Sequence, residues 1–406
     1  MKILLVSTAW PWPTRKGYQL RLLQLAEAFA GRHEVTLLVP EPASAAAGSV
    51  TPPSGAASRS PFAVETFRRS RVEAVRGVGS ALFSPRALES GLVDSEDLRR
   101  RLRELAPHFD RVVLQLVRLA GVADLLDGTP WVLDLVDSLS LNLERRAAID
   151  RLWLRPLLRF EARRLAADER RMIAASSVSL LVSERDRRHL AATLPPALAA
   201  RLTVVPLALP PPPPAATSPM PRPFPPAGEA ELAITGNLGY FPTVRGIHWF
   251  LDQIWPEVVR KYPRTRLLVA GARPPRSLAR RVRRLGGRLL ADPSDLTVLL
   301  AGADIALAPL LAGSGTPIKL LEALAAGIPA VATPAAAEGL DPALARCLAI
   351  PEDAAAWVTT LHGLIANPVA ARARADVGAR LVHELHSPER VARALEASLE
   401  QPRPAG

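Results

Sequence analysis

Short apolar runs alternate with amphipathic stretches along the chain. Residues 3–7 form an apolar run of strand length, and Leu, Ala and Phe recur at helical spacing over residues 18–31. A second apolar run, residues 34–39, follows after a glycine. The order strand, helix, strand is the opening of a βαβ unit, which builds a parallel sheet.

The same alternation continues through both halves of the chain. Further strands of the first half are expected at residues 111–116, 131–136, 177–182 and 202–207. The second half predicts strands at 232–235, 266–269, 288–290, 305–308 and 330–332, with helices at 247–254, 276–285 and 317–326 between them. The pattern predicts an α/β protein made of two Rossmann-like, doubly wound parallel sheets.

A proline tract separates the two halves. Five consecutive prolines occupy 210–214 and others follow up to Pro226. Such a tract cannot join a sheet and favours an extended spacer. We therefore expect an N-terminal domain at 1–208, a Pro-rich linker at 209–229, a second domain at 230–375 and C-terminal helices at 376–406. Residues 41–61, rich in Ala, Ser, Gly and Pro, are expected to form a surface loop.

The composition limits the function classes. The single cysteine, Cys347, excludes an intramolecular disulfide framework and a cysteine-based zinc cluster. The formal net charge of +12 favours anionic partners, but no nucleic-acid-binding module accompanies it, so nucleic acid is not an expected partner. With no apolar run of about 18 residues and no convincing signal peptide, we expect a cytoplasmic protein without a spanning helix.

The residues from Gly313 to Glu322 carry the strongest chemical signal, because they follow a predicted strand and open a helix. Gly313 and Gly315 allow a tight turn around Ser314, Thr316 suits the N-cap, and Pro317 suits the first helical position. The exposed N–H groups of such a helix start attract anions.

Lys319 and Glu322 lie three residues apart and share one helix face. A lysine near a phosphate and a carboxylate near ribose hydroxyls suit a nucleoside diphosphate. The alternative is an ordinary solvent-exposed Lys–Glu pair. The chain has only four lysines, Lys2, Lys16, Lys261 and Lys319, which favours a specific role for Lys319.

Residues 305–340, IALAPLLAGSGTPIKLLEALAAGIPAVATPAAAEGL, resemble the donor-binding signature of the group 1, retaining glycosyltransferases of GT-B fold. The matching features are Lys319 and Glu322 on a helix, an Ala-Gly-x-Pro-x-Val turn at 326–331, and Glu338-Gly339. The resemblance implies two Rossmann-like domains facing across a cleft. It also implies final helices that pack back on the first domain, and sugar transfer with retention of configuration.

Residues 234–271 are similar to the segment that opens the family's second domain. Arg245, in the expected loop at 236–246, matches a basic residue that holds the pyrophosphate, and an arginine fork suits phosphate. An exposed loop arginine is the alternative. The donor-binding residues that the resemblance implies are Gly236, Asn237, Arg245, Gly313, Ser314, Gly315, Thr316, Lys319 and Glu322.

The loop after the first strand is a third match to the family, where a glycine faces the transferred sugar and the acceptor. Here that glycine is Gly17, with Arg15 and Lys16 beside it.

The chain departs from the family pattern at two positions. Ser314 stands where the family has the first of two glutamates, and a Gly-Ser-Gly-Thr loop resembles a subset linked to bacterial exopolysaccharide and cell-surface assembly. The residue near the reacting sugar is often His in the family, and here Asp137 follows the predicted strand 131–136, with Asp134 as its competitor. An N-cap of the next helix is the alternative role for Asp137.

Together these features predict transfer of a sugar from a nucleoside-diphosphate sugar to a glycan or lipid-linked acceptor, with no cofactor and no metal. Arg245 and Lys319 would stabilise the leaving diphosphate, and Asp137 would act beside the acceptor. A nucleotide-sugar epimerase of the same fold and a catalytically silent, membrane-associated binding subunit stay open.

A basic, apolar stretch bears on the membrane. Residues 151–165 suit either the inner face of an anionic membrane or a core-facing helix with an Arg-rich outer face.

Overall fold

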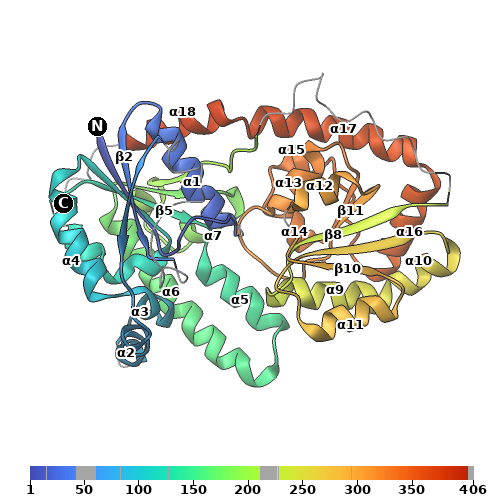
Figure 1. Ribbon diagram of the computed structural model, residues 1–406, viewed down its shortest axis with the longest axis horizontal. Coiled ribbons are helices and arrows are strands. Elements are labelled where there is room, and N and C mark those ends of the chain that lie inside the picture. The colour runs from blue at the N-terminus through green and yellow to red at the C-terminus, as the bar shows by residue number, and fades with distance from the viewer. Residues whose placement is uncertain are drawn as a thin grey trace. The chain divides into compact units, whose positions relative to one another are not determined.

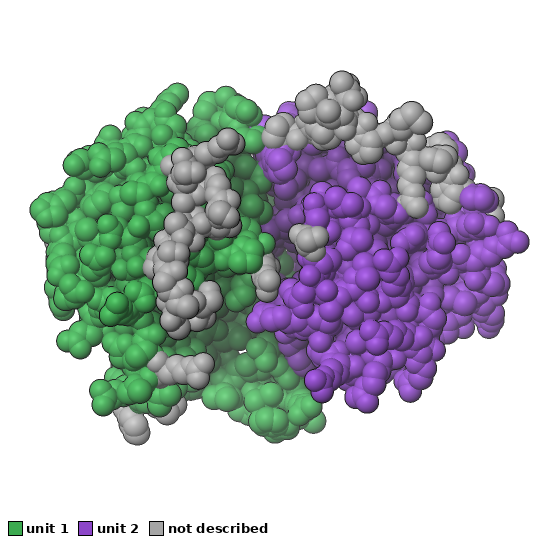
Figure 2. Space-filling view, viewed as in Figure 1, with its two compact units in different colours: residues 1–208, 388–406 green, residues 209–387 purple. Residues whose placement is uncertain are grey.

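The computed structural model describes residues 1–14, 16–42, 61–82, 84–126, 128–210, 226, 228–293 and 295–400. They form two compact units, which Figure 2 colours separately. Unit 1 is built from Met1–Ala208 and Pro388–Gly406, and unit 2 from Leu209–Ser387. Most of the expected linker (211–225 and 227) and most of the expected surface loop (43–60) lie outside the described residues.

Unit 1 contains, within its described residues, a seven-stranded parallel sheet in the order β3-β2-β1-β4-β5-β6-β7 (Figure 1). Strand β5 is buried along its whole length, as expected for a parallel strand that is covered on both faces. The strands are β1 (Lys2–Val6), β2 (Glu34–Pro40), β3 (Ala63–Phe67), β4 (Arg111–Gln115), β5 (Trp131–Val136), β6 (Val178–Leu181) and β7 (Leu202–Val204).

Helices pack on both faces of this sheet because successive side chains point to opposite faces. Ile3 and Leu5 belong to one core cluster, which includes Leu22, Leu25 and Phe29 of α1. Leu4 and Val6 belong to a second cluster, which α4 and α6 share. The helices are α1 (Gly17–Ala30), α2 (Arg71–Leu82), α3 (Leu88–Val93), α4 (Glu96–Leu105), α5 (Leu139–Ile149), α6 (Arg155–Ala175), α7 (Glu184–Ala191), α8 (Pro196–Ala199) and α18 (Pro388–Leu399), with 3₁₀ turns η2 (Ala106–His108), η3 (Val117–Gly121), η4 (Ala123–Leu126) and η5 (Leu152–Leu154).

Unit 2 contains, in the part of it that is described, a five-stranded parallel sheet in the order β10-β9-β8-β11-β12. Its strands are β8 (Glu231–Asn237), β9 (Arg266–Ala272), β10 (Arg288–Ala291), β11 (Ile305–Ala308) and β12 (Ala330–Ala332). Its helices are α9 (Phe241–Gln253), α10 (Trp255–Lys261), α11 (Arg276–Arg284), α12 (Leu296–Ala301), α13 (Ile318–Ala325), α14 (Pro334–Ala337), α15 (Pro342–Ala345), α16 (Ala354–Ala366) and α17 (Pro368–Leu385).

The last two helices belong to different units. Helix α17 stays whole across residue 375, because its buried Gly378 and Val382 pack in unit 2. The chain therefore enters unit 1 at Pro388 and not at residue 376. Val391, Leu395 and Leu399 of α18 then join the same core cluster as α1.

The expected loop at residues 236–246 is wrong beyond Tyr240. Helix α9 begins at Phe241, with Pro242 in its first turn, so Arg245 and Gly246 are helical. A Cβ atom on Gly246 would lie 1.7 Å from the carbonyl oxygen of Pro309. The glycine that suggested a loop instead allows α9 to pack closely against the chain that follows β11.

None of the helices within the described ranges is both long and apolar enough to cross a membrane.

Gly246→Ala is expected to lower the free energy of unfolding by about 3 kcal/mol or more, because its methyl group overlaps backbone that must shift. The matched control is Gly363→Ala in α16, where an added Cβ meets nothing within 4 Å. That control should stabilise the protein by about 0.5–1 kcal/mol. Urea unfolding measures both variants, and a Gly246→Ala midpoint equal to the wild type would contradict the close approach.

Candidate functional site

The carboxyl edge of the unit 2 sheet contains a point where the strand order reverses. The chain runs from β8 outward to β9 and β10, then returns to the other side of β8 with β11. In open parallel sheets, ligands bind beyond the carboxyl ends of the strands at such a reversal. The segments that leave β8 at Gly236 and β11 at Pro309 therefore define a candidate ligand site.

Lys319 lies at this reversal, against the backbone of β8. Gly236 has a φ of +131°, and a Cβ atom there would lie 3.0 Å from Lys319 Nζ. A side chain at residue 236 would therefore crowd the ammonium group, and glycine leaves it room. The structure thus brings together Gly236, Lys319 and Glu322, the last from the same helix α13.

Lys319 and Glu322 are both half-buried, so the interpretation of them as an exposed surface pair is wrong. Burial lowers the pKa of Lys319 to about 8, an effect that Glu322 opposes. Burial raises the pKa of Glu322 to about 7, with Lys319 opposing and Asp295 adding to the rise. Desolvation thus favours the neutral form of each group, and a ligand that brings phosphates to Lys319 and hydroxyls to Glu322 would relieve this.

The loop between β11 and α13 is held by the later Glu-Gly segment. Gly315 has a φ of +67°, and a Cβ atom on Gly339 would lie 2.0 Å from the carbonyl oxygen of Gly315. Thr316 Oγ1 donates a hydrogen bond of 3.0 Å to the carbonyl oxygen of Gly339. The prediction that Thr316 caps α13 is wrong, because its hydroxyl is directed to Gly339 and Pro317 occupies the N-cap.

Gly313 and Ser314 lie half-buried at the start of the same loop. An added Cβ at Gly313 would meet nothing within 4 Å, so this glycine borders open space. The loop therefore leaves room for a ligand beside Ser314 while its far end is fixed by Gly339.

The other two predicted donor residues occupy different surroundings. Asn237 Oδ1 accepts a hydrogen bond of 3.0 Å from the N–H of Gly239 and so shapes the turn after β8. Arg245 is exposed on α9. With burial and Arg281, it lowers the pKa of His248 one turn away.

The strand order of the unit 1 sheet also reverses, between β1 and β4. Ser7 Oγ donates to Gln115 Oε1 at 2.8 Å, and Gln115 Nε2 donates to the carbonyl oxygen of Tyr18 at 2.9 Å. The ends of β1 and β4 are thereby tied to the start of α1, where Gly17 is the first residue and Lys16 the N-cap. Arg15 lies outside the described residues.

A cluster of charged and aromatic groups gathers at this second reversal. Lys16 Nζ donates to the hydroxyl of Tyr18 at 3.0 Å. The guanidinium of Arg118 lies 6.0 Å from the centre of the Tyr18 ring and donates from Nε to Glu89 at 2.6 Å. Sequence reasoning missed Tyr18 and Arg118, since nothing in their spacing links η3 to the start of α1.

Asp134 in β5 and Asp137 just after it have different surroundings. Asp134 is fully buried and pairs with the equally buried Arg21 at 3.3 Å. Burial raises the pKa of Asp134, and Arg21 opposes the rise. Asp137 is half-buried beyond the strand end, where Val136 has a φ of +65°. Asp137 is not the N-cap of α5; Ser138 is, accepting from the N–H of Leu141.

Glu169 of α6 lies beneath this strand end and was not predicted. Its carboxylate accepts hydrogen bonds from the hydroxyls of Ser138 and Ser140 and from the N–H of Ser140. Burial raises the pKa of Glu169 to about 7, the hydrogen bonds oppose this, and the charge of Asp137 adds to it. Glu169 therefore ties α6 to the turn that presents Asp137.

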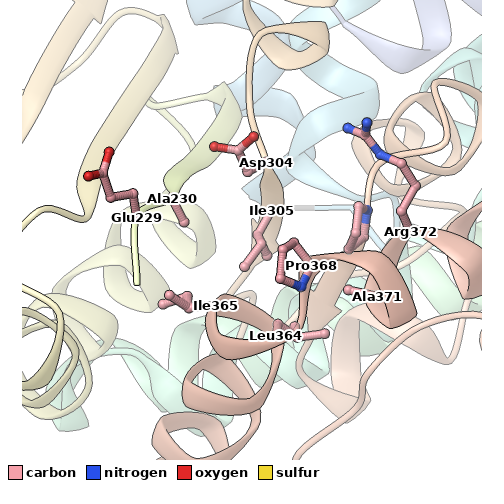
Figure 3. Close-up of a pocket in the computed structure, with 10 residues that line it drawn as sticks. Glu229, Ala230, Asp304, Ile305, Leu364, Ile365, Pro368, Ala371 and Arg372 are labelled. Carbon is pink, nitrogen blue, oxygen red and sulfur yellow. The ribbon is translucent and has the colours of Figure 1, made fainter. Parts of the chain in front are cut away.

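The pocket in Figure 3 lies at the opposite, amino edge of the unit 2 sheet, by Ala230 and Ile305. Its acidic side chains already have partners: Glu229 pairs with Arg264 at 2.8 Å, and Asp304 accepts from the N–H of Glu231 at 2.8 Å. This pocket is therefore not the candidate site. Among the described residues, no group of three or more His, Cys, Asp or Glu side chains is placed to hold a metal ion.

Comparison with known proteins finds a family match in unit 2. Residues 229–367 match the family "Glycosyl transferases group 1". Among solved structures, sucrose-phosphate synthase from Thermosynechococcus elongatus is similar, with a TM-score of 0.69, 15% identity, and coverage of 99% of this chain and 98% of that one.

Two further solved structures are similar over nearly their whole lengths. HepE from Anabaena in complex with UDP-glucose gives a TM-score of 0.67 at 14% identity, covering 99% of this chain and 100% of that one. WaaG, a glycosyltransferase involved in lipopolysaccharide biosynthesis, gives a TM-score of 0.64 at 18% identity. The match covers 97% of this chain and 99% of that one. No curated protein sequence matches the chain. The chain thus has the GT-B fold, and its residues 229–367 match the group 1 glycosyltransferase family.

Glu169→Gln is expected to flatten the pH dependence of stability. The pKa of Glu169 is about 7 in the folded protein, against an ordinary value of 4.5. Protonation of Glu169 therefore stabilises the folded state fully below pH 4.5, and this stabilisation is lost as the pH rises to 7. The variant should remove as much as about 3 kcal/mol of the change in free energy of unfolding across that window.

Urea unfolding at a series of pH values measures this effect. Glu322, which has a raised pKa in the same window, is retained in both proteins and cancels in the comparison. Glu144→Gln, at an exposed position of α5, is the matched control and should follow the wild-type profile. A Glu169→Gln profile parallel to the wild type would contradict the assignment.

Proposed function

We propose that this chain, whose residues 229–367 form a group 1 glycosyltransferase domain, transfers a sugar from a nucleoside-diphosphate sugar to a glycan or lipid-linked acceptor. The observation that carries the proposal is the half-buried pair Lys319 and Glu322 at the strand-order reversal of unit 2. The solved structures with UDP and UDP-glucose make a UDP-sugar the first donor to test.

In the proposed reaction, the bond between the sugar's anomeric carbon and the diphosphate oxygen breaks, and the oxygen of an acceptor hydroxyl bonds to that carbon with retention. The proton of that hydroxyl passes to the departing diphosphate. Lys319 and Arg245 neutralise the departing diphosphate, and Glu322 accepts hydrogen bonds from the ribose hydroxyls. The backbone N–H groups around Gly313, Ser314, Gly315 and Thr316 bind the sugar or its phosphate.

Unit 1 supplies the acceptor side of this proposal. Lys16 and Gly17 line the acceptor, and Asp137 positions the attacking hydroxyl or stabilises the cation-like sugar centre. The Gly-Ser-Gly-Thr loop and the likeness to WaaG and HepE favour a bacterial exopolysaccharide or cell-surface glycan as the product.

Nucleotide binding is the first test. UDP at about 100 times its dissociation constant should stabilise the protein by about 2.7 kcal/mol, visible as a higher melting temperature. Lys319→Ala and Glu322→Ala should abolish most of that shift, because they remove the phosphate and ribose contacts. Lys261→Ala, at an exposed lysine of α10, is the matched control and should keep it. GDP and ADP measured in parallel identify the base.

Sugar transfer is the second test. Lys319→Ala should lower kcat/KM for transfer by about 100-fold or more, as expected when a group that stabilises the leaving charge is removed. Near-wild-type turnover would exclude that role. If the protein isomerises the donor sugar in the absence of an acceptor, it is an epimerase. If it binds nucleotide but shows no turnover of the donor, it is a catalytically silent subunit.

A further inference from the structure

The hairpin formed by α5 and α6 has a structured tip. The two helices run side by side and are joined through residues 150–154, which include η5 (Figure 1). Buried Asp150 accepts hydrogen bonds from Arg146 Nε at 3.0 Å and from the N–H of Arg151 at 2.8 Å. Its carbonyl oxygen accepts from Arg155 Nε at 3.1 Å. The tip therefore presents its outer side chains from a fixed backbone.

Four large apolar side chains of this tip face solvent. Leu152 and Trp153 on η5 are 75% and 70% exposed, and Leu157 and Phe160 on α6 are 53% and 55% exposed. Trp153, Leu157 and Phe160 follow the spacing of one helix face, while Leu165, Met172 and Ile173 further along α6 are buried in the core of unit 1. A contiguous exposed apolar face of this kind marks an interaction surface.

The exposed charged side chains from residue 150 to residue 169 are all positive. Arg151, Arg159 and Arg163 are exposed, and their side chains form no ion pair among the described residues. Every carboxylate from residue 150 to residue 169 is buried, namely Asp150, Glu161, Asp168 and Glu169. Glu161, the one acidic residue between Arg151 and Arg163, accepts from the N–H groups of Leu88 and Glu89. From residue 150 to residue 169, the exposed side chains thus include large apolar and cationic groups and no acidic group.

We propose that the α5–α6 tip docks on an anionic lipid membrane. Trp153 and the neighbouring leucines would enter the boundary between headgroups and acyl chains, and the three free arginines would contact lipid phosphates. The positive charge of the exposed residues from 151 to 163 fits an anionic bilayer better than a protein surface of mixed charge. The expectation of a core-facing helix with an Arg-rich outer face holds for α6, which buries Leu165 and Met172 and exposes Arg159 and Arg163. Leu157 and Phe160 share that outer face.

Vesicle flotation of the full chain tests the docking without relying on the proposed transfer activity. The wild type should bind vesicles of phosphatidylcholine with phosphatidylglycerol, bind phosphatidylcholine alone much less, and dissociate as salt rises. Trp153→Ser/Leu157→Ser and Arg159→Gln/Arg163→Gln should each lower the partition coefficient about tenfold or more. All variants should keep the wild-type melting temperature and its response to nucleotide.

Two matched variants act as controls. Val369→Ser/Val377→Ser changes exposed apolar positions of α17, and Arg280→Gln/Arg284→Gln changes exposed arginines of α11. Both should bind vesicles like the wild type. The proposal is overturned if the wild type does not bind anionic vesicles, or if the α11 pair loses as much binding as the tip variants. It is also overturned if sedimentation shows a dimer that Trp153→Ser/Leu157→Ser dissociates, since a second copy would then cover the face.

Discussion

Removing a charge from water costs several kcal/mol unless an opposite charge or hydrogen bonds replace the lost hydration. The two units meet this constraint differently. Unit 1 pairs Arg21 with Asp134 inside its core, and Arg21 also donates to the carbonyl oxygen of Pro206. Unit 2 leaves Lys319 and Glu322 half-buried, with pKa values of about 8 and 7. The first pair stabilises the core of unit 1, and the second is the pair that we propose binds the donor.

The same contrast, between a charge that is paired in the core and one that is not, separates Asp134 in β5 from Asp137 just after it. A sequence places Asp134 and Asp137 three residues apart at the end of one apolar run, and both are candidates for chemistry. The structure gives Asp134 to a buried arginine and leaves Asp137 beyond the strand end, within electrostatic reach of Arg118 and Glu169. Asp134 is buried and paired with Arg21, so it cannot contact a substrate. Only Asp137 stays a candidate for the residue near the reacting sugar.

The sequence predicted the elements whose signal is local. Apolar runs located β4, β5, β8 and β11 within a residue or two, because buried parallel strands are apolar on both faces. Gly246 was predicted to lie in a loop, but it lies in helix α9. A glycine interrupts the helical pattern of apolar residues both in a loop and where a helix packs closely on another segment. Arg118 and Glu169 were missed because the topology, and no sequence spacing, brings them to one strand end. The sequence also could not show which apolar side chains of residues 151–160 are exposed and which are buried in the core.

Helix α18 completes the core of unit 1, although the whole of unit 2 separates it from the rest of that unit in the chain. Topologically, unit 2 is an insertion within unit 1. During synthesis from the N-terminus, unit 2 has all of its strands and helices before unit 1 receives its last one. Until α18 is synthesised, Leu22, Leu25 and Phe29 of α1 lack part of their packing partners, so the unit whose synthesis begins first receives its last helix after unit 2 is complete.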